Sequence, residues 1–462
     1  MFVEKNLLER YTQVIMQRTL ISETTKKVGD TVFMQGYVHV VRDHGKITFF
    51  DLYDRTGIVQ CVGQNLSKLS PQDVLSVTGK VANRPEKLIN EKIPTGKVEI
   101  QVESVEVLSH ADELPFDMAK ENLDLQLPTL LDFRTLTLRH SSVSKIFRIQ
   151  EAVMEGFRRA AIKLDCTEVF VPTISASATE GGSEVFSVDY YDHKTFLVQS
   201  PQLYKQMVVP AFERVFLISH AYRSEPSVTT RHLSEVIQLD CELGFVNFEE
   251  LMDAMEFVGR ETLNYVSKTH PEILKIFGID APKFGKKIPR LKMREAQEII
   301  KKRTGVDHTN EKDLMPDDER EISMWAMEEY GSDLVTITHY PTKKRAFYTM
   351  PDPADPEYSL SYDLIFRGVE IMSGSQRINK YPDLVSEMKT RGLKLENFEM
   401  YLQAFKYGMP PEGGFSFGLE RITMLLLNLA NVREASLFPR DMERVDFTFS
   451  SRKHTDVDKA KG

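Results

Sequence analysis

The sequence predicts an α+β chain in which a small β-barrel precedes a larger domain of sheet and helices. Five β-rich runs follow one another between Thr31 and Leu108, separated by glycine and proline. From Ser141 onward, stretches with helical periodicity alternate with strand-like stretches. We therefore expect a helical N-terminal extension at 1–20, a barrel at 21–109, a hinge at 110–140 and a second domain at 141–462.

Composition and charge exclude several classes of protein. The 462 residues are 41% hydrophobic and 27% charged, as in a typical globular chain, and the net charge of -9 argues against a globally basic nucleic-acid binder while leaving room for a local basic groove. The cysteines, Cys61, Cys166 and Cys241, are too far apart for a zinc motif or a disulfide framework. This cysteine pattern fits a reducing cytoplasm. The charged N-terminus and the lack of long apolar runs predict a protein without a signal peptide or membrane span.

The five β-rich runs predict an OB-type barrel. A short polar segment, 65–73, lies between the third and fourth runs, and a helical link at that place is typical of this fold. Phe49 and Phe50 are adjacent in the second run, so one of the two rings is expected to point out of the barrel. An exposed ring there is a candidate for stacking on a nucleic-acid base. The alternative is that both rings belong to a small core.

The larger domain is organised around residues 216–245, which are predicted to form a strand, a polar loop and a second strand. The second strand places Gln238, Asp240 and Glu242 on one face and apolar residues on the other. A sheet with one apolar and one charged face is suited to the floor of a binding site. A surface hairpin with scattered ion pairs is the alternative that these residues alone leave open.

Three arginines are candidate phosphate ligands, because a guanidinium fork matches phosphate oxygens. Arg223 lies at the end of the first strand and Arg231 in the loop that follows. Arg421 begins a very apolar helix after a glycine-rich stretch, so it is a charge near the interior that requires a partner. A bound phosphate would supply that partner.

A second hairpin, predicted at 359–378, brings two carboxylates onto one face. If the chain turns at Arg367–Gly368, Glu370 lies opposite Ile365, and Asp363 lies diagonally from Glu370 on the same face. Two carboxylates near a candidate phosphate site suit Mg2+. The alternative is a pair of exposed acids on an ordinary hairpin.

The remaining segments are consistent with a site built over a sheet. A helical stripe runs through 144–163 and a short strand follows it. The glycine-rich stretch 177–186 is a candidate mobile loop. A helix after Ser200 would begin with proline and present polar side chains on one face. Residues 248–335 are predicted to be mostly helical, and the acidic helix near 315–331 is predicted to be simply solvated.

Three pieces of the chain together resemble motifs 1, 2 and 3 of the class II aminoacyl-tRNA synthetases: the strand ending at Pro172, Arg223-x-Glu225 and Gly418-x-Glu420-Arg421. The preceding OB-type domain is similar to that of the aspartate, asparagine and lysine subgroup. The segments QSPQLYKQ, RGVEIMSGSQRI and LFPRD resemble aspartyl-tRNA synthetases of the archaeal and eukaryotic type. The resemblance implies an antiparallel sheet of about six or seven strands flanked by helices, and ATP-dependent ligation of aspartate to tRNA through an aspartyl-adenylate.

The resemblance also implies a role for each matching residue. Arg223 and Arg421 would be the catalytic arginines, since they hold oxygens on which negative charge develops. ATP would contact Arg223, Glu225, Arg231, His232, Glu370, Gly418 and Arg421. Aspartate would contact Glu180, Ser200, Gln202, Lys205, Asp240, Ser373 and Arg377. Mg2+ would be bound by Asp363, Glu370 and Ser373.

For the tRNA, the resemblance places Phe49 under the central anticodon base, Gln60 beside it and His39 near the third base. Histidine there is more typical of relatives that charge both tRNA(Asp) and tRNA(Asn), so we expect both as substrates. Strict use of tRNA(Asp) stays open, because the long segment 83–100 obscures a second discriminating position. Charging of tRNA(Asn) would require an amidotransferase in the same pathway. A homodimer through the helix at 144–163 and the following strand is also implied, although the apolar stripe of that helix could equally be core.

Two departures and three competing functions remain. Ser416 stands where many class II enzymes have glycine, and Val236 where some relatives stack an aromatic ring on adenine.

An asparaginyl-tRNA synthetase is disfavoured by Lys205, because a second cation suits a carboxylate better than an amide. A paralogue that binds RNA without charging it would be expected to lack the arginines or the metal acids. An enzyme that modifies something other than tRNA would not need Phe49 and Gln60.

Overall fold

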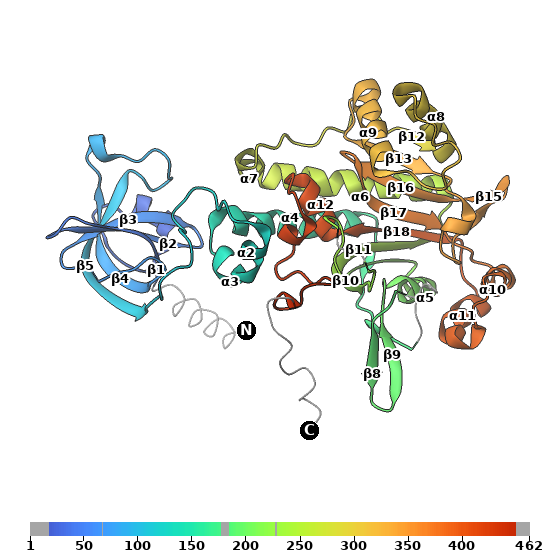
Figure 1. The fold of residues 1–462 in the computed structure, drawn as a ribbon, viewed down its shortest axis with the longest axis horizontal. Helices are drawn as coiled ribbons and strands as arrows, with labels where there is room; N and C mark the ends of the chain where they lie inside the picture. Colours follow the sequence, from blue (N-terminus) through green and yellow to red (C-terminus); the bar gives the residue numbers. More distant parts are fainter. Residues whose placement is uncertain (1–17, 67, 177–183, 227–228, 450–462) are drawn as a thin grey trace, which may run out of the picture. The chain divides into compact units, whose positions relative to one another are not determined.

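The computed structural model describes residues 18–66, 68–176, 184–226 and 229–449 (Figure 1). Contacts within the chain divide it into two units, Met1–Leu125 and Gln126–Gly462. The division lies inside the segment predicted as a hinge, whose second half is helical and forms α2 (Leu127–Asp132) and α3 (Arg134–Thr137). The helix predicted at 1–20 falls almost wholly outside the described residues. Within the described part of the chain, every helix is too short or too polar to span a membrane.

The first unit is a closed five-stranded barrel, as predicted. Its strands are β1 (Thr31–Asp43), β2 (Thr48–Asp54), β3 (Gly57–Gly63), β4 (Val74–Asn83) and β5 (Val98–Ser109). They pair in the order β1-β2-β3-β5-β4, and β1 closes the barrel against β4. Alternating side chains fill the interior, among them the buried Met34, Phe50 and Leu52. The expected helical link is wrong, because the described residues of 65–73 form turns.

The second unit is built on an eight-stranded sheet. In spatial order its strands are β12 (Arg290–Lys292), β13 (Leu334–Thr338), β16 (Ser361–Phe366), β17 (Val369–Gln376), β18 (Glu412–Gly418), β11 (Glu235–Gly244), β10 (Arg214–Tyr222) and β6 (Thr167–Glu168). Neighbours are antiparallel except at the two edges, where β12 runs parallel to β13 and β6 to β10. The sheet is therefore wider than the resemblance implied and mixed at its edges. The strand predicted up to Pro172 pairs only at β6, which is 2 residues long.

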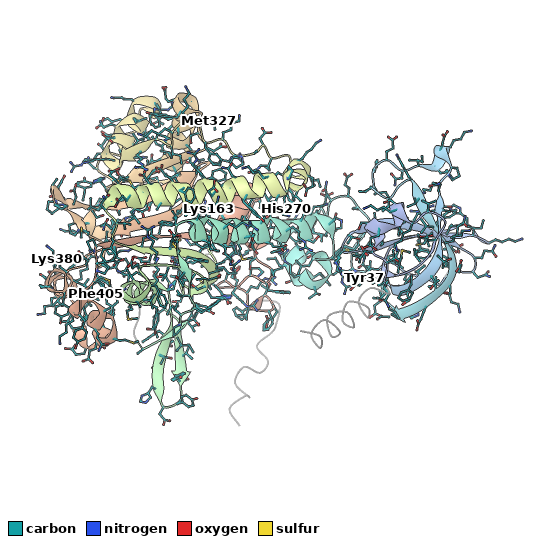
Figure 2. All side chains as sticks on the ribbon, turned by 180° about the vertical axis from the view of Figure 1, so that it is seen from behind. Tyr37, Lys163, His270, Met327, Lys380 and Phe405 are labelled. Atoms are coloured by element: carbon teal, nitrogen blue, oxygen red, sulfur yellow. The ribbon has the colours of Figure 1, made fainter. Side chains whose placement is uncertain are left out.

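Two long helices, α4 (Ser141–Lys163) and α6 (Phe248–Thr269), lie side by side across one face of this sheet (Figure 1). In Figure 2, Lys163 marks the end of α4 and His270 the end of α6, and Lys163 forms an ion pair with Glu261 of α6. The apolar stripe of α4 packs into the core formed with the sheet: Ile146, Ile149, Val153 and Phe157. The expectation of a dimer contact along α4 was based on this stripe. These four side chains are buried inside the chain itself, so they give no support to a dimer contact.

Smaller elements surround the sheet. The remaining helices are α5 (Gln202–Phe212), α7 (Pro271–Ile276), α8 (Met293–Thr304), α9 (Pro316–Tyr330), α10 (Tyr381–Thr390), α11 (Glu399–Lys406) and α12 (Leu419–Leu426). Two small sheets consist of β14 (Pro351–Asp352) with β15 (Asp355–Ser359), and of β7 (Ile174–Ser175), β9 (His193–Leu197) and β8 (Ser187–Tyr190). Helices α8 and α9 pack through their apolar faces on β13 and β16. Helices α5, α10 and α11 share a separate apolar cluster.

Local sequence signals explain where these helices begin and end. Asn247 caps α6 by accepting from the Glu250 amide, and the Glu250 carboxylate accepts from the Asn247 amide in return. α8 ends at Gly305, whose φ of +77° is left-handed and therefore favours glycine. α9 begins with Pro316, and three acids in its first turn favour the positive end of the helix dipole. One of these acids is Glu319, whose side chain is only 17% exposed.

Candidate active site

The charged face of β11 forms the floor of a cavity of about 340 Å³. Gln238 and Asp240 line this cavity. On the opposite face of the strand, Leu239, Cys241 and Leu243 are buried in the core beside α4 and α6. The alternation predicted for residues 216–245 is therefore confirmed. These strands lie inside the sheet and do not form a surface hairpin.

The cavity brings together nearly all the described residues that the sequence singled out in this unit. They come from the strand ends, from α5 and α12, and from the loop after β10: Ser200, Gln202, Lys205, Arg223, Glu225, Arg231, His232, Asp240, Glu370, Ser373, Arg377, Gly418 and Arg421. Asp363 lies directly behind this wall, where Ser373 Oγ donates to its Oδ1 at 2.7 Å. Glu180 lies outside the described residues.

One end of the cavity carries loosely paired cations. Arg421 Nη1 donates to the Glu370 carbonyl at 3.2 Å and lies 3.8 Å from Glu370 Oε1. Arg223 Nη1 lies 3.9 Å from Glu225 Oε1, and His232 Nε2 lies 3.6 Å from Glu225 Oε2. Long, partly exposed ion pairs contribute little stability. These cations are therefore suited to exchange a carboxylate partner for the phosphate of a ligand.

Arg231 contacts an acid that the sequence did not single out. Its Nη1 lies 3.8 Å from Oε2 of Glu319, in the first turn of α9. Burial, and then repulsion from Glu370, raise the pKa of Glu319 to about 7. The helix predicted to be simply solvated thus places a largely buried carboxyl group beside Arg231, which lines the cavity.

Asp363 and Glu370 form the candidate metal site. The strand register confirms the predicted hairpin, with Glu370 opposite Ile365, and it places Ser373 opposite Asp363. Burial, and then repulsion from Asp363, raise the pKa of Glu370 to about 7. A divalent cation would relieve that repulsion, and the Ser373 hydroxyl offers a further oxygen. The residues therefore fit Mg2+, which proteins commonly bind through one or two carboxylates together with substrate phosphates.

Arg345 adds a positive charge at this place. Its Nη2 donates to Asp363 Oδ2 at 2.7 Å, its Nη1 donates to Ser373 Oγ at 3.2 Å, and its guanidinium lies 4.0 Å from the centre of the Tyr340 ring. Arg345 therefore compensates the charge of Asp363. Among the described residues, no group of three or more His, Cys, Asp and Glu side chains is arranged to hold a metal.

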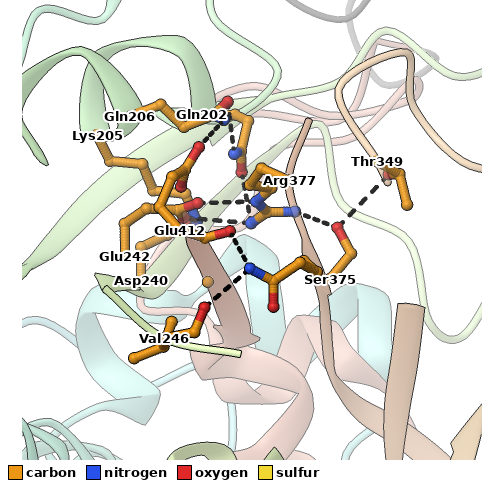
Figure 3. A network of polar contacts seen from close by, with 12 residues as sticks. Gln202, Lys205, Gln206, Asp240, Glu242, Val246, Thr349, Ser375, Arg377 and Glu412 are labelled. Atoms are coloured by element: carbon orange, nitrogen blue, oxygen red, sulfur yellow. Dashed lines mark hydrogen bonds and ion pairs between the residues drawn. The ribbon is translucent and has the colours of Figure 1, made fainter. Parts of the chain in front are cut away.

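The other end of the cavity holds two buried cations (Figure 3). Lys205 Nζ lies 2.8 Å from Asp240 Oδ1 and 3.1 Å from Glu242 Oε2. Arg377 donates to Glu242 through Nε at 2.7 Å and Nη2 at 3.2 Å, and to Ser375 Oγ through Nη1 at 2.6 Å. Lys205 is 1% exposed and Arg377 is 4% exposed. This end is a small enclosed polar pocket, suited to a ligand that carries both charged signs.

Electrostatics keep the principal groups of this pocket charged. Burial would lower the pKa of Lys205, but Asp240 and Glu242 raise it above its usual value. Burial would likewise raise the pKa of Glu242, but Arg377 and Lys205 bring it down to about 2. Burial raises the pKa of Asp240, and Lys205 opposes that rise. At neutral pH the pocket therefore presents two cations together with an ionised Glu242.

In the first unit, the predicted nucleic-acid contacts lie on the outside of the barrel. Phe50 is fully buried, whereas its neighbour Phe49 is partly exposed, so Phe49 is the ring that points outward. Gln60 donates to Glu99 Oε2 at 3.0 Å, within a polar surface formed by β2, β3 and β5. His39 lies at an irregularity of β1, where the pairing with β2 shifts by one residue. The barrel thus presents an exposed ring and polar side chains on its outer surface.

Four residues of the site were missed or left without a role by the sequence. Alternation on β11 placed Glu242 on the charged face, but gave it no partner. Glu412 stands before two glycines. That context predicts close packing of the backbone but does not indicate which charged residue lies near Glu412. Arg345 and Glu319 come from segments whose local pattern carries no signal for a site. In each case the functional signal is a contact between segments that are far apart in the chain.

Comparison with known proteins gives the class of the chain. Residues 126–442 match the family model described as tRNA synthetases class II (D, K and N). Residues 32–108 match the model described as an OB-fold nucleic acid binding domain. The fold and the cavity therefore belong to a class II aminoacyl-tRNA synthetase with an OB-fold domain before it.

Individual relatives narrow the class. The chain is 41% identical over 430 residues to the aspartate–tRNA(Asp/Asn) ligase of Thermus thermophilus, covering 93% of this chain and 99% of the relative. It is 39% identical over 441 residues to the aspartate–tRNA(Asp) ligase of Pyrococcus abyssi, covering 92% of this chain and 98% of the relative. The chain belongs to the aspartate–tRNA ligase family.

Solved structures share the fold across amino-acid specificities. An aspartyl-tRNA synthetase from Entamoeba histolytica matches with a TM-score of 0.81 and 30% identity, covering 93% of this chain and 92% of that one. The asparaginyl-tRNA synthetase from Pyrococcus horikoshii, complexed with asparaginyl-adenylate, matches with a TM-score of 0.84 and 29% identity, covering 93% of this chain and 99% of that one. The fold alone therefore does not determine which amino acid is used.

Proposed function

We propose that this synthetase uses ATP to convert L-aspartate into aspartyl-adenylate and then transfers the aspartyl group to tRNA(Asp) and also to tRNA(Asn). The observation that carries the proposal is the pair of buried cations, Lys205 and Arg377, at the closed end of the cavity. Two cations there suit the side-chain carboxylate of an acidic amino acid. The loosely paired arginines at the other end suit a polyphosphate.

In the first step, the α-carboxylate of aspartate attacks the α-phosphorus of ATP and pyrophosphate leaves. Arg223 holds the α-phosphate, while Arg421, together with Arg231 or His232, holds the terminal phosphate. Negative charge develops on these oxygens, so cations held nearby stabilise the transition state. Glu225 accepts a hydrogen bond from the adenine amino group. Catalysis by these residues is positioning and charge stabilisation, with no covalent enzyme intermediate.

The amino acid is held by charge complementarity. Lys205 and Arg377 bind the side-chain carboxylate, and Asp240 binds the α-ammonium group. Gln202 supports Arg377, because its Oε1 accepts from Arg377 Nη2 at 3.4 Å. Ser200 lies at the start of the same segment and lines the cavity. The reacting carboxylate is thereby directed toward the end that holds the phosphates.

Mg2+ is part of the proposal. Glu370 and Asp363 would hold it with Ser373, and bound Mg2+ would neutralise charge on the phosphates of ATP. The chain's own part is to keep both carboxyl groups on one hairpin.

The proposal extends to partners and location. Phe49 would stack on the central anticodon base, with Gln60 beside it and His39 near the third base. A homodimer is proposed, now on the basis of exposed apolar residues at the end of α4 and after β6, Ile162 at 56% and Phe170 at 87% exposure. Use of tRNA(Asn) would require an amidotransferase in the same pathway. We propose a cytoplasmic location, consistent with three free buried cysteines.

Exchange of pyrophosphate into ATP tests the first step. The expected result is exchange that depends on aspartate and Mg2+, with asparagine far less effective. Exchange with asparagine and none with aspartate would identify an asparaginyl-tRNA synthetase. No exchange with either amino acid, from a protein that still binds tRNA, would identify a paralogue that binds RNA without charging it.

A further inference from the structure

Glu412, the first residue of β18, is a fully buried acid beneath the closed end of the cavity (Figure 3). Its Oε1 accepts from Gln206 Nε2 at 2.7 Å. Its Oε2 has no hydrogen-bond donor among the described residues. Gln206 is itself fixed, because its Oε1 accepts from Gln202 Nε2 at 3.0 Å and from the Tyr401 hydroxyl at 3.1 Å. The hydrogen bond that Glu412 Oε1 accepts therefore comes from a neutral amide and not from a cation.

Glu242 is the acid that faces Glu412, and their carboxyl groups are within hydrogen-bonding contact. Arg377 binds Glu242 through two nitrogens, and Lys205 lies 3.1 Å from it. Among the described residues, the groups that act on Glu412 are Glu242 on β11, Arg377 after β17, Gln206 on α5 and Tyr401 on α11. None of the hydrogen bonds of Arg377 reaches the Glu412 side chain.

Two carboxylates in contact inside a protein cannot both be ionised without a large cost. Glu242 is the acid that carries the negative charge, because Lys205 and Arg377 both contact it. A proton on Glu412 Oε2 would give that atom a partner and would supply Glu242 with a hydrogen bond. Burial, and then repulsion from Glu242, accordingly raise the pKa of Glu412 well above its usual range.

We propose that Glu412 is held as a neutral carboxylic acid and that its neutrality makes the pocket select a side-chain carboxylate over a carboxamide. This inference rests on the proposed function. With Asp240 engaged by the α-ammonium group, Lys205 and Arg377 face Glu242 and the carboxylate of aspartate, so two positive charges meet two negative ones. An ionised Glu412 would add a third negative charge. The balanced ligand would then be asparagine, whose side chain is neutral.

The proposal predicts a preference that depends on pH. As the pH rises and Glu412 ionises, exchange supported by aspartate should weaken relative to exchange supported by asparagine. Glu412→Gln keeps a neutral group of the same shape, whose amide can donate to Glu242 and whose oxygen can accept from Gln206. This variant should retain the aspartate preference at neutral pH and should lack the wild-type decline in that preference at alkaline pH.

The experiment measures pyrophosphate exchange with aspartate and with asparagine from neutral to alkaline pH, for the wild type, Glu412→Gln and Glu242→Gln. Taking the ratio for the two amino acids cancels the titration of ATP, and comparing the wild type with Glu412→Gln cancels the different titration of the two α-ammonium groups. Glu242→Gln is the matched contrast, since it neutralises the acid that is proposed to carry the charge. It should lower aspartate exchange at least tenfold more than Glu412→Gln does at neutral pH.

Several outcomes would overturn the proposal. One is a loss at neutral pH that is as large in Glu412→Gln as in Glu242→Gln, with both variants folded by thermal melting. Another is the same pH dependence of the aspartate-to-asparagine ratio in the wild type and Glu412→Gln. If Glu412→Gln fails to fold, a wild-type ratio that does not change toward alkaline pH overturns it instead. Failure of the wild type to use either amino acid would refute the proposed function itself, which is a different result.

Discussion

At the scale of single residues, the site divides into side chains that a strand pattern can place and side chains that it cannot. The period of two on β11 was enough to put Gln238, Asp240 and Glu242 on one face, because successive side chains of a strand point to opposite sides. Glu412 and Arg345 could not be predicted in this way. Each contacts or faces an acid on a strand from another part of the chain, Glu242 on β11 or Asp363 on β16, and only the folded structure brings them together.

Lys205→Met tests the assignment of the buried lysine to aspartate. The change removes a charge-assisted contact worth roughly 1.5–3 kcal/mol, so the KM for aspartate in pyrophosphate exchange should rise about ten- to a hundredfold or more. The KM for ATP should change far less, because Lys205 lies at the end of the cavity away from Arg421 and Arg231. Lys301→Met, which removes an exposed lysine paired with Asp307, is the control and should change neither constant. Equal losses for ATP and aspartate would place Lys205 elsewhere in the mechanism.

Glu420→Gln tests how the burial of the Glu420 carboxyl group affects the stability of the folded protein. Glu420 is 5% exposed, its carboxylate accepts from the Ile237 amide, and burial raises its pKa to about 7. The folded protein therefore keeps a proton that the unfolded chain loses as the pH rises from about 4.5 to about 7, so stability falls across that window by at most about 3 kcal/mol. Glutamine has no proton to lose in this range.

The melting temperature of Glu420→Gln minus that of the wild type should therefore be larger at pH about 8 than at pH about 4.5. Glu298→Gln, an exposed acid on α8, is the control and should give the same difference at both values. A difference for Glu420→Gln that does not change with pH would show that the carboxyl titrates alike in the folded and unfolded chain.

At the scale of elements, predictions succeeded where a pattern is long and failed where it is short. The helix α4, the hairpin β10–β11 and the hairpin β16–β17 each carry a periodicity that only one structure satisfies. The edge strands β6 and β12 are 2 and 3 residues long, too short to carry a period. The role of α9 was missed for a different reason, since its acidic first turn looks the same whether it faces solvent or Arg231.

Phe49→Ala tests the outer surface of β2. If the ring stacks on an anticodon base, its loss should weaken aminoacylation of tRNA(Asp) by about 1–3 kcal/mol, which is roughly five- to a hundredfold in kcat/KM for tRNA. Pyrophosphate exchange does not involve the anticodon and should stay within the error of the wild-type value. Phe33→Ala removes another exposed ring of the barrel, 38% exposed on β1, and should leave both reactions unchanged. Normal charging by Phe49→Ala would mean that the ring only packs on the barrel.

At the scale of the whole molecule, the division of labour follows the two units. The first unit carries the outward ring and polar surface proposed to bind the anticodon, and the second carries the cavity proposed to join aspartate and ATP. Under this proposal, the choice of amino acid belongs to the second unit and the reading of the anticodon to the first. The sequence predicted both folds, because the barrel and the sheet each have their own patterns, but it did not determine the choice of tRNA, which is proposed to depend on single side chains.

The anticodons of tRNA(Asp) and tRNA(Asn) differ at the third base, C against U. His39 lines a hollow of the first unit together with Ser70 and Pro71, and it is only partly buried. The small polar ring of His39 leaves more room for a base than a larger ring would, and it can form a hydrogen bond with either pyrimidine.

We therefore expect this synthetase to charge both tRNAs with aspartate. The measurement is kcat/KM for transcripts with GUC and GUU anticodons, in the wild type and in His39→Trp. The wild-type values should lie within about a hundredfold of each other, the scale of one good base contact. His39→Trp should widen the gap in favour of GUC while pyrophosphate exchange stays constant, since its larger ring narrows the space for the third base. A wild-type preference for GUC beyond that scale would mean that other side chains of the barrel already read the third base.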